Sequence, residues 1–489
     1  MTPFILTMAL TLLIAIWAAR RGSERAAMYS ASATLTSTQN GLAIAGDFLS
    51  ANTLLGMVAL YFTSGIDALI YYCSPLLGLY LMLKFVAGPL RRLGRFTLAD
   101  VIGGRFPDER LRRLLGVISI LISVMYLVAQ LVGGGALMSI LFGTSFDTGV
   151  MIVGGLTATY AVFGGMLATS WVQIVKATAL LSVIAWISVL AMWHSGGIEA
   201  IYERVGQVAG GGLLRFGGMH LGVYSTLSLI TSLTLGMLGL PHLLVRIFTV
   251  PDERAARNSI SVATRVIFIS FALMFAVISP AAVAFVKTAA QFHDSSGAIL
   301  GGPNMITLHL ASALGGQTLF GIASAVTFST ILAVVGGLTV TIATAFSHDI
   351  CTTIQWLAPR DERGELVRFR LAALLSTVIA AGLAVVFQRE NLAFLVATAF
   401  SVAASTTFPM LILTLYWRGL TANGAMTAGW VGMVVSMALI VLSPACWVKT
   451  FGFPVALFPS DYPALVSVPF AFFAAWWVSR HEFDSLVRV

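Results

Sequence analysis

The feature that most constrains this chain is a long series of apolar segments joined by short polar loops. A helix needs about 20 apolar residues to cross a lipid bilayer, and we count thirteen segments near that length. They are continuous apolar runs without the alternation of a membrane β-barrel, so we predict an all-α integral membrane protein. The predicted spans are approximately 3–19, 40–62, 67–88, 114–142, 148–166, 172–193, 223–249, 260–287, 319–347, 368–388, 392–416, 424–443 and 463–479.

The composition agrees with a membrane protein and argues against a nucleic-acid partner. Of the 489 residues, 58% are hydrophobic and only 10% are charged, whereas a soluble domain carries about 25% charged residues. The net charge is +8, but the basic residues lie in short loops between apolar runs, where they set the topology in the lipid bilayer. Cys73, Cys351 and Cys446 are far apart, so we expect neither a disulfide framework nor a metal centre built on them.

The distribution of basic residues predicts the orientation in the membrane. If the N-terminus is outside, the loops after the odd-numbered spans are cytoplasmic and should be rich in Arg and Lys. The opposite loops hold only Arg204, Arg215, Arg389 and Lys449. We therefore predict a multi-pass protein of the cell inner (plasma) membrane, with the N-terminus outside and the C-terminus in the cytoplasm. The basic residues on the predicted cytoplasmic side are Arg20, Arg21, Arg25, Arg91, Arg92, Arg95, Arg105, Arg110, Arg112, Arg113, Arg254, Arg257, Arg360, Arg363, Arg368, Arg418, Arg480 and Arg488.

Two of the predicted spans contain an interruption near their middle. Span 40–62 carries Gly46 and Asp47, and a carboxylate in hydrocarbon costs about 2.5–3.5 kcal/mol. Span 223–249 carries Gly239-Leu240-Pro241, where proline removes a backbone donor and predicts a kink or an unwound turn. Backbone groups freed at these points cannot face lipid and must line an enclosed cavity. Either water, an ion or a partner solvates Asp47 there, or Asp47 only hydrogen-bonds to neighbouring backbone.

The two interrupted spans lie five apart in the count, which predicts two matching five-helix units. Interrupted segments at corresponding positions of two halves indicate a transporter site near the bilayer midplane. Residues 1–489 then form a single transmembrane transporter domain. We divide it into a leading helix and loop (1–38, with 3–19 retained rather than cleaved as a signal), a first repeat (39–195), a second repeat (223–420), and two terminal helices with a short cytoplasmic tail (421–489).

Several long motifs resemble a known family. They are "NGLAIAGDFLSANTLLG", "RRLGRFTLADVIGGRF", "TYAVFGGMLATSWVQIVKA", "MLGLPHLLVRIFTV", "STILAVVGGLTVTIATAFSHDI" and "VLSPACWVKTFG" with "FPSDYPALVSVPFAF". From about residue 39 to the end the chain resembles the sodium:solute symporter family, and within it the cation:acetate, or monocarboxylate, branch. The resemblance implies thirteen helices, a five-plus-five inverted-repeat core and secondary active transport. One cation that enters along the membrane potential provides about 2.3 kcal/mol per 100 mV.

The resemblance also implies a sodium site between the first interrupted helix and the helix predicted at 319–347. Sodium is a hard cation, and unwound carbonyls with Ser/Thr hydroxyls supply oxygen ligands without excess buried charge. As an alternative, the hydroxyls bond back to carbonyls one turn earlier in their own helix. The implied cation ligands are the carbonyls of Gly46, Leu49 and Val326 and the hydroxyls of Ser329 and Thr330.

Two departures from the family pattern leave alternatives open. Counted back from Asp349, the spacing of many relatives selects Ala333 and Val334, which have no side-chain oxygen, so one helical turn of register is open. The acid of other branches aligns with Phe48, whereas this chain carries its acid at Asp47. Sodium is therefore favoured, and proton coupling through Asp47 stays open.

The carboxylate of the substrate needs hydrogen-bond donors, and the positive end of a half-helix is an anion site. Gln130 offers an amide in the middle of its span, or it bridges two helices. His242 follows the second interruption and is either a proton sensor near neutral pH or structural. Arg246 is assigned to topology and gating. The predicted substrate-binding residues are Asp47, Phe48, Ser50, Gln130, Gly239, Leu240 and Pro241.

Other classes of function fit the sequence less well. No HExxH, GxSxG, Cys/His cluster or nucleotide loop indicates an enzyme, and no carbonyl-filter sequence indicates a channel. We predict a symporter that couples inward sodium movement to uptake of a short-chain monocarboxylate of the acetate, propionate, lactate or pyruvate class by alternating access. We expect no cofactor besides Na⁺ and no obligatory protein partner. The alternatives are a proton-coupled carrier of the same family for another small solute, such as an amino acid, and an ion channel.

Overall fold

The structure of the chain is a computed structural model that describes residues 6, 35–93, 97–163, 166–210, 212–355, 357–358 and 361–487. Within these residues every regular element is helical, which confirms the all-α class. The predicted span 3–19 lies outside the described residues except for residue 6. Nine helical stretches of the described part are long and apolar enough to cross a membrane, so the predicted count of thirteen stays a prediction.

The helices follow the predicted apolar spans, and polar caps fix where several of them begin. The side chains of Asp252, Asp361 and Thr421 accept hydrogen bonds from backbone N–H groups in the first turns of three helices. The elements used below are α3 (Ser37–Phe48), η2 (Asn52–Gly56), α4 (Met57–Ser64), α5 (Leu69–Leu81), α6 (Ala87–Leu93), α7 (Leu98–Arg105), α8 (Glu109–Phe142), α9 (Phe146–Phe163), α10 (Met166–Ser195), α11 (Ile198–Ala209), α12 (Val223–Met237), α13 (Pro241–Val245), η6 (Arg246–Thr249), α14 (Glu253–Leu273), η7 (Met274–Ile278), α15 (Ser279–Val286), α16 (Ile306–Thr344), η10 (Ala345–Ile350), α17 (Glu362–Val386), α18 (Leu392–Ser405), α19 (Thr407–Tyr416), α20 (Ala422–Val441) and α21 (Ala464–Val487).

Both predicted interruptions are present in the backbone. α3 ends at Phe48, and Leu49 leaves the helical conformation with φ −71° and ψ 82° before a wider helical turn, η2, resumes the path. α12 ends at Met237, and Leu240 is extended with φ −69° and ψ 114°. Pro241 is the first residue of α13, a position where its missing N–H has no helical acceptor to bond. The fold therefore has a discontinuous helix at both places that the sequence indicated.

α16 is longer than the predicted span 319–347 because it extends past a bend. The bend lies at Gly315 and Gly316, and Gly316 has φ +60°, a left-handed conformation that favours glycine. The arm before the bend reaches the first interrupted helix, since the Thr307 hydroxyl donates to the Leu54 carbonyl at 2.6 Å. The arm thus covers the second half of that helix.

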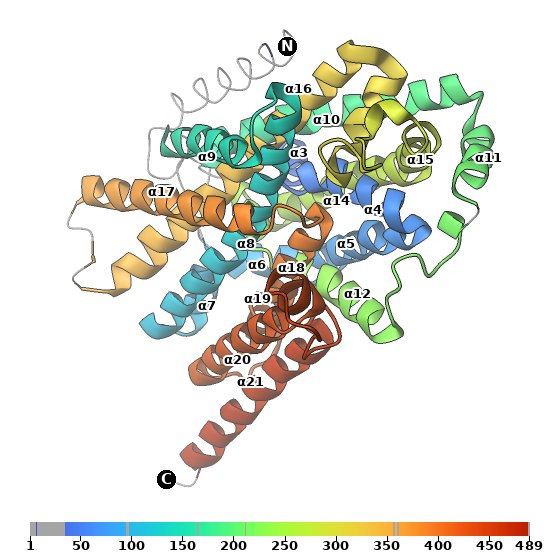
Figure 1. Cartoon of the computed structure of the whole chain (residues 1–489). Coiled ribbons are helices and arrows are strands. Elements are labelled where there is room, and N and C mark those ends of the chain that lie inside the picture. Colours follow the sequence, from blue (N-terminus) through green and yellow to red (C-terminus); the bar gives the residue numbers. More distant parts are fainter. Residues whose placement is uncertain are drawn as a thin grey trace.

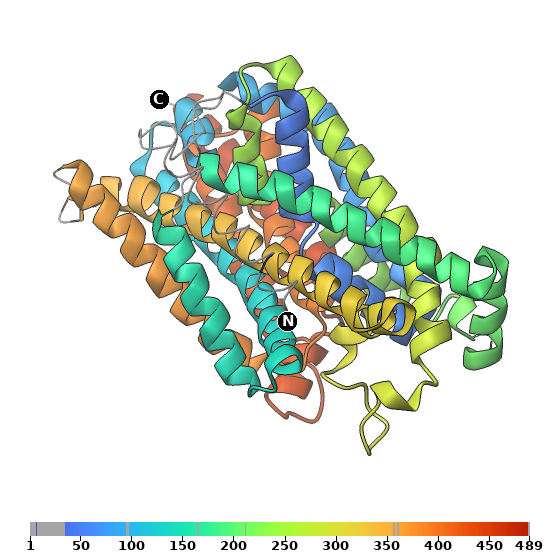
Figure 2. The ribbon, with the colours of Figure 1, turned by 90° about the horizontal axis from the view of Figure 1, so that it is seen from above.

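The two interrupted helices meet inside the bundle. α13 contacts α3, α8 and α16, while α3 packs along α10 and α14. Figure 1 shows α20 and α21 as a pair that projects toward the C-terminus, with α9 and α17 at one side of the molecule. Figure 2 shows α9 and α17 along one edge in the view from above. The peripheral helices leave the interrupted segments enclosed, and every residue from 43 to 58 is buried.

Candidate functional site

Asp47, the acid of the first interrupted helix, is buried and paired with Arg246 of the second. Arg246 Nε donates to Asp47 Oδ2 at 2.5 Å, and the side chains of Arg246 and Asp47 are only 2% and 5% exposed. Arg246 begins η6 directly after α13, and its Nη1 also donates to the Ser170 hydroxyl of α10. The ion pair joins the last turn of α3 to the segment that follows α13, and it provides the partner that a buried carboxylate requires.

Hydrogen bonds to its backbone also hold Arg246 in place. Asn40 of α3 donates its Nδ2 to the Arg246 carbonyl at 3.0 Å. The Thr249 hydroxyl lies 2.8 Å from both Asn40 Oδ1 and the Arg246 carbonyl. All three residues are buried. The start of α3 and the segment after the second interruption are thus tied together, a role beyond the topology and gating assigned to Arg246 from the sequence.

Gly46 is required by the close approach of two helix backbones. A Cβ atom at position 46 would lie 3.0 Å from the Gln173 carbonyl carbon and closer still to its carbonyl oxygen. A side chain does not fit there without moving α10 away from α3. The glycine beside Asp47 therefore has a structural reason: it lets α10 cross directly behind the buried acid.

Lys176 of α10 reaches across this crossing to the first interrupted helix. Its Nζ donates to the Gly46 carbonyl and, at 3.0 Å, to Gln173 Oε1. Gln173 Nε2 in turn donates to the Ala333 carbonyl of α16 at 3.0 Å. Lys176 and Gln173 are both buried. The sequence analysis missed both, although a lysine inside the predicted span 172–193 is the kind of intramembrane charge that marks a site.

The segment of α16 that faces the last turn of α3 lies C-terminal to the predicted hydroxyl ligands. A Cβ at Gly337 would lie 3.3 Å from Asp47 Oδ1, and the Ala333 carbonyl accepts a hydrogen bond from α10. The hydroxyl of Thr330 is buried without a hydrogen-bond partner in the described part of the chain. The predicted ligands of α16 are all buried and precede Ala333 by up to two turns: Val326, Ser329 and Thr330. The role of these three residues in cation binding stays a prediction.

A small enclosed cavity adjoins the first interruption. Its volume is about 20 Å³, enough for about one water molecule. The aromatic rings of Phe48, Tyr126 and Phe400 line it together with the polar side chains of Asn52 and Thr53. The Phe400 ring centroid is 6.5 Å from that of Phe48 and 6.5 Å from that of Tyr126. The cavity thus offers both apolar walls and polar groups.

Several buried polar side chains near this cavity have no hydrogen-bond partner among the described residues. The Tyr126 ring lies 5.1 Å from the His242 ring, and its hydroxyl lies near Ser50. Gln130 is one turn after Tyr126 on the same face of α8. An unpaired buried polar group costs about 1–3 kcal/mol, so their gathering indicates a place where a polar ligand binds. The unpaired groups are Asn52 Oδ1 and both polar side-chain atoms of Gln130 and of His242.

The predicted residues of the second interruption lie elsewhere. A Cβ at Gly239 would lie 2.5 Å from the Ala403 carbonyl oxygen, so this glycine allows close packing against α18. Leu240 is fully buried, and Pro241 lines a different cavity from Phe48. α13 has only five residues. The assignment of these three residues to the substrate stays a prediction.

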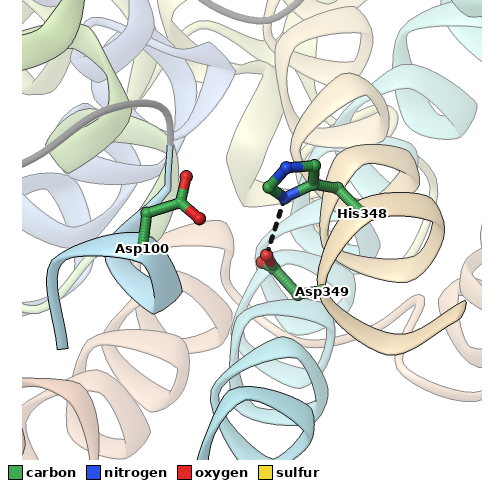
Figure 3. A group of neighbouring side chains, drawn as sticks. All are labelled: Asp100, His348 and Asp349. Carbon is green, nitrogen blue, oxygen red and sulfur yellow. Dashed lines mark hydrogen bonds and ion pairs between the residues drawn. The ribbon is translucent and has the colours of Figure 1, made fainter. Parts of the chain in front are cut away.

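A second polar cluster is formed by Asp100 of α7 with His348 and Asp349 of η10 (Figure 3). Their ligand atoms lie within 4.8 Å of one another, and His348 Nδ1 is 3.0 Å from Asp349 Oδ1. Arg112 of α8 pairs with both carboxylates, 3.0 Å from Asp100 Oδ1 and 3.5 Å from Asp349 Oδ1. Because a guanidinium already binds both acids, the cluster fits an ion network better than a metal centre.

This second cluster lies at one end of another small cavity. The cavity has a volume of about 20 Å³. Its lining includes Asp349 of the cluster, the nearby Thr97, and Pro241 and Val245 of α13. The Thr97 hydroxyl also donates to Asp349 Oδ1 at 3.3 Å. The cluster therefore holds α7, α8 and η10 together over a space that reaches the second interruption.

Comparison with known proteins agrees with this architecture. A family model described as the sodium:solute symporter family matches residues 28–432. The structure is similar to the substrate-bound, outward-open state of a Na⁺-coupled sialic acid symporter, with a TM-score of 0.76 and 13% identity over 98% of this chain and 96% of that one. It is also similar to a nucleobase-cation-symport-1 family transporter in a closed conformation (TM-score 0.52, 11% identity, 94% of each chain). A manganese transporter of Eremococcus coleocola is similar over 90% of this chain and 92% of that one, with a TM-score of 0.50 and 16% identity. At these identities the likeness shows a shared transporter fold.

Proposed function

The chain belongs to the sodium:solute symporter family, as its motifs predicted, and we propose that it couples inward sodium movement to uptake of a short-chain monocarboxylate by alternating access. Membership of this family supports sodium as the coupling ion. The substrate class comprises acids such as acetate, propionate, lactate and pyruvate. The observation that carries this choice of substrate is the charge balance of the buried cluster at the two interruptions.

The buried cluster contains two basic side chains and one acidic side chain. Arg246 is paired with Asp47, whereas Lys176 binds the neutral oxygens of Gly46 and Gln173. In the contacts of the described residues one positive charge is left without a carboxylate, and an unbalanced buried charge is costly. A substrate that brings one carboxylate offers Lys176 a counter-charge, while the co-transported sodium binds other oxygens. A neutral solute offers no such group.

The cavity beside the cluster supports a short substrate. The rings of Phe48 and Phe400 suit a short aliphatic chain, and the Gln130 amide is an unpaired donor for a carboxylate, with the Ser50 hydroxyl as a second candidate donor. The volume of about 20 Å³ is smaller than such an acid, so the rings must separate when the site opens.

Sodium would bind oxygen atoms close to the same interruption. The candidates are the Leu49 carbonyl, which the break in α3 releases from regular helical bonding, and the α16 residues Val326, Ser329 and Thr330. The unpaired Thr330 hydroxyl supports this assignment. We further propose that the protein lies in the plasma membrane with its N-terminus outside, because basic residues set topology in this way.

Uptake by the purified full chain in proteoliposomes tests the proposal. Labelled acetate and pyruvate should accumulate when an inward sodium gradient is imposed, and accumulation should saturate with substrate. The sodium gradient and the pH gradient are varied separately. Uptake driven only by a pH gradient would replace sodium with the proton as coupling ion, and flux that neither gradient drives nor substrate saturates would favour a channel.

A further inference from the structure

The structure places a lysine where a free cation would be expected to bind. α3 ends at Phe48, so Gly46 lies in its last turn. Carbonyl groups of a last turn lack helical partners, and this end of a helix attracts positive charge. Lys176 Nζ donates to the Gly46 carbonyl from α10. The attractive position at the end of α3 is therefore already filled by a positive group of the chain itself.

Where α16 faces the crossing of α3 and α10, its described residues carry no side-chain oxygen. α16 faces the crossing with Ala333 and Gly337, and the residue after Ala333 is Val334. The Ala333 carbonyl accepts the amide of Gln173. The Gly46 carbonyl and Gln173 Oε1 are two oxygens at the crossing, and Lys176 donates to both. A metal ion would have to displace the lysine to reach them.

The nearby acid has another partner. Asp47 Oδ2 accepts Arg246 Nε at 2.5 Å, and Lys176 is buried at 2% exposure. Among the described contacts Lys176 therefore donates to carbonyl oxygens and forms no ion pair with Asp47. Such an arrangement reproduces the charge and the ligands of a bound monovalent cation.

We propose that the Lys176 ammonium is a built-in cation that fills the cation position at the Gly46 carbonyl, so that sodium does not bind there in the native chain. This inference rests on the proposed function and deepens it. Any sodium that the chain carries uses other oxygens, such as those of Val326, Ser329 and Thr330.

The number of sodium ions bound per chain tests this inference. The full chain is purified in detergent, and bound radioactive sodium is counted by equilibrium dialysis at saturation and constant pH. Lys176→Gln removes the ammonium, frees the Gly46 carbonyl and adds an amide oxygen. We expect this variant to bind one more sodium ion per chain than the native protein. Lys176→Arg keeps the charge and should leave the count unchanged, as should Lys287→Gln, which removes a lysine at the end of α15.

Each outcome of this experiment decides the question. Equal counts for Lys176→Gln and the native chain overturn the inference. A count that rises from zero to one supports the inference, while the sodium coupling of the proposed function is then what fails, as gradient-driven uptake would show independently. If Lys176→Gln does not fold, an experimental structure of the native chain at saturating sodium replaces the count. An ion on the Gly46 carbonyl with Lys176 displaced contradicts the inference, and the lysine on that carbonyl without an ion supports it.

Discussion

Two clusters of ionic side chains in the described part of the chain differ in exposure more than in residue type. In the inner cluster the side chains of Arg246 and Asp47 are 2% and 5% exposed. In the outer cluster, which is the second polar cluster of Asp100, His348 and Asp349 with Arg112, the Arg112 side chain is 30% exposed. Its partner Asp349 is 3% exposed. Ionic attraction is stronger away from water, and exposed pairs are screened by salt. We therefore expect the buried Arg246–Asp47 pair to hold its helices together more strongly than the partly exposed Arg112 pairs hold theirs.

The position of each cluster agrees with this division. The inner pair joins the two interrupted helices beside the unpaired polar groups. The outer cluster links α7, α8 and η10 over a cavity that reaches Pro241. We therefore expect changes at the inner cluster to abolish binding, and changes at the outer cluster to alter how often the site opens.

Neutralising Asp47 should have the largest effect on uptake. Asp47→Asn leaves Arg246 buried without a counter-charge, which costs about 3–5 kcal/mol. We expect the initial rate of labelled acetate uptake in proteoliposomes to fall by roughly 100-fold or more. The double variant Asp47→Asn/Arg246→Gln should recover the melting temperature but not the uptake. Native kinetics in Asp47→Asn would remove this acid from the mechanism.

The crossing behind the inner pair should be nearly as sensitive. Gly46→Ala puts a methyl group against the Gln173 backbone and should lower the free energy of unfolding by about 1–3 kcal/mol. The melting temperature of the purified protein in detergent measures this change. Gly103→Ala is the matched control, because nothing lies within 4 Å of a Cβ at that helical position. Similar melting temperatures for both variants would show that the crossing is looser than the structure has it.

Substitution of the α16 hydroxyls tests where sodium binds relative to the inner cluster. Ser329→Ala and Thr330→Ala should each raise the half-saturating sodium concentration about tenfold, as expected for a lost ligand of about 1 kcal/mol or more. Sodium-dependent uptake at fixed substrate is the measurement. Thr327→Ala is the control, because its hydroxyl bonds back to the Ala323 carbonyl at 2.7 Å. If only substitutions at Ala333 or Val334 change the sodium dependence, the predicted register is wrong.

The outer cluster should give the smallest effect. Arg112→Gln removes a partly exposed guanidinium, and such pairs contribute about 1 kcal/mol or less. We expect uptake to change by about two- to fivefold, and high ionic strength to affect the native chain more than the variant. Arg113→Gln is the control, since Arg113 contacts only an exposed backbone carbonyl in the described contacts. A loss as large as that of Asp47→Asn would contradict the division between the two clusters.

The features of the site that could be predicted from the sequence are local ones. The interruptions at Asp47 and at Pro241 are visible because a carboxylate or a proline within an apolar run is unfavourable in a membrane helix. The helix boundaries follow from apolar length and from capping residues such as Asp252. Each of these signals lies within one helix, so a single segment suffices to recognise it.

The partners across the bundle could not be predicted in the same way. The Asp47–Arg246 pair spans 199 residues, and no spacing rule connects such positions. The contact of Lys176 with Gly46 depends on how closely α10 crosses α3, which is a property of tertiary packing. Lys176 itself carried a usable signal, namely a charge inside an apolar span. Its partner carried none, because a backbone carbonyl looks the same at every position of a sequence.

Equilibrium binding of a labelled monocarboxylate tests whether the charged cluster of Asp47, Arg246 and Lys176 binds the anionic substrate. Labelled acetate and pyruvate are titrated into the purified native chain and into the Asp47→Asn/Arg246→Gln variant, with folding of both verified by melting temperature. We expect saturable binding at one site per native chain and its loss in the folded variant. Undiminished binding by the folded variant would contradict it.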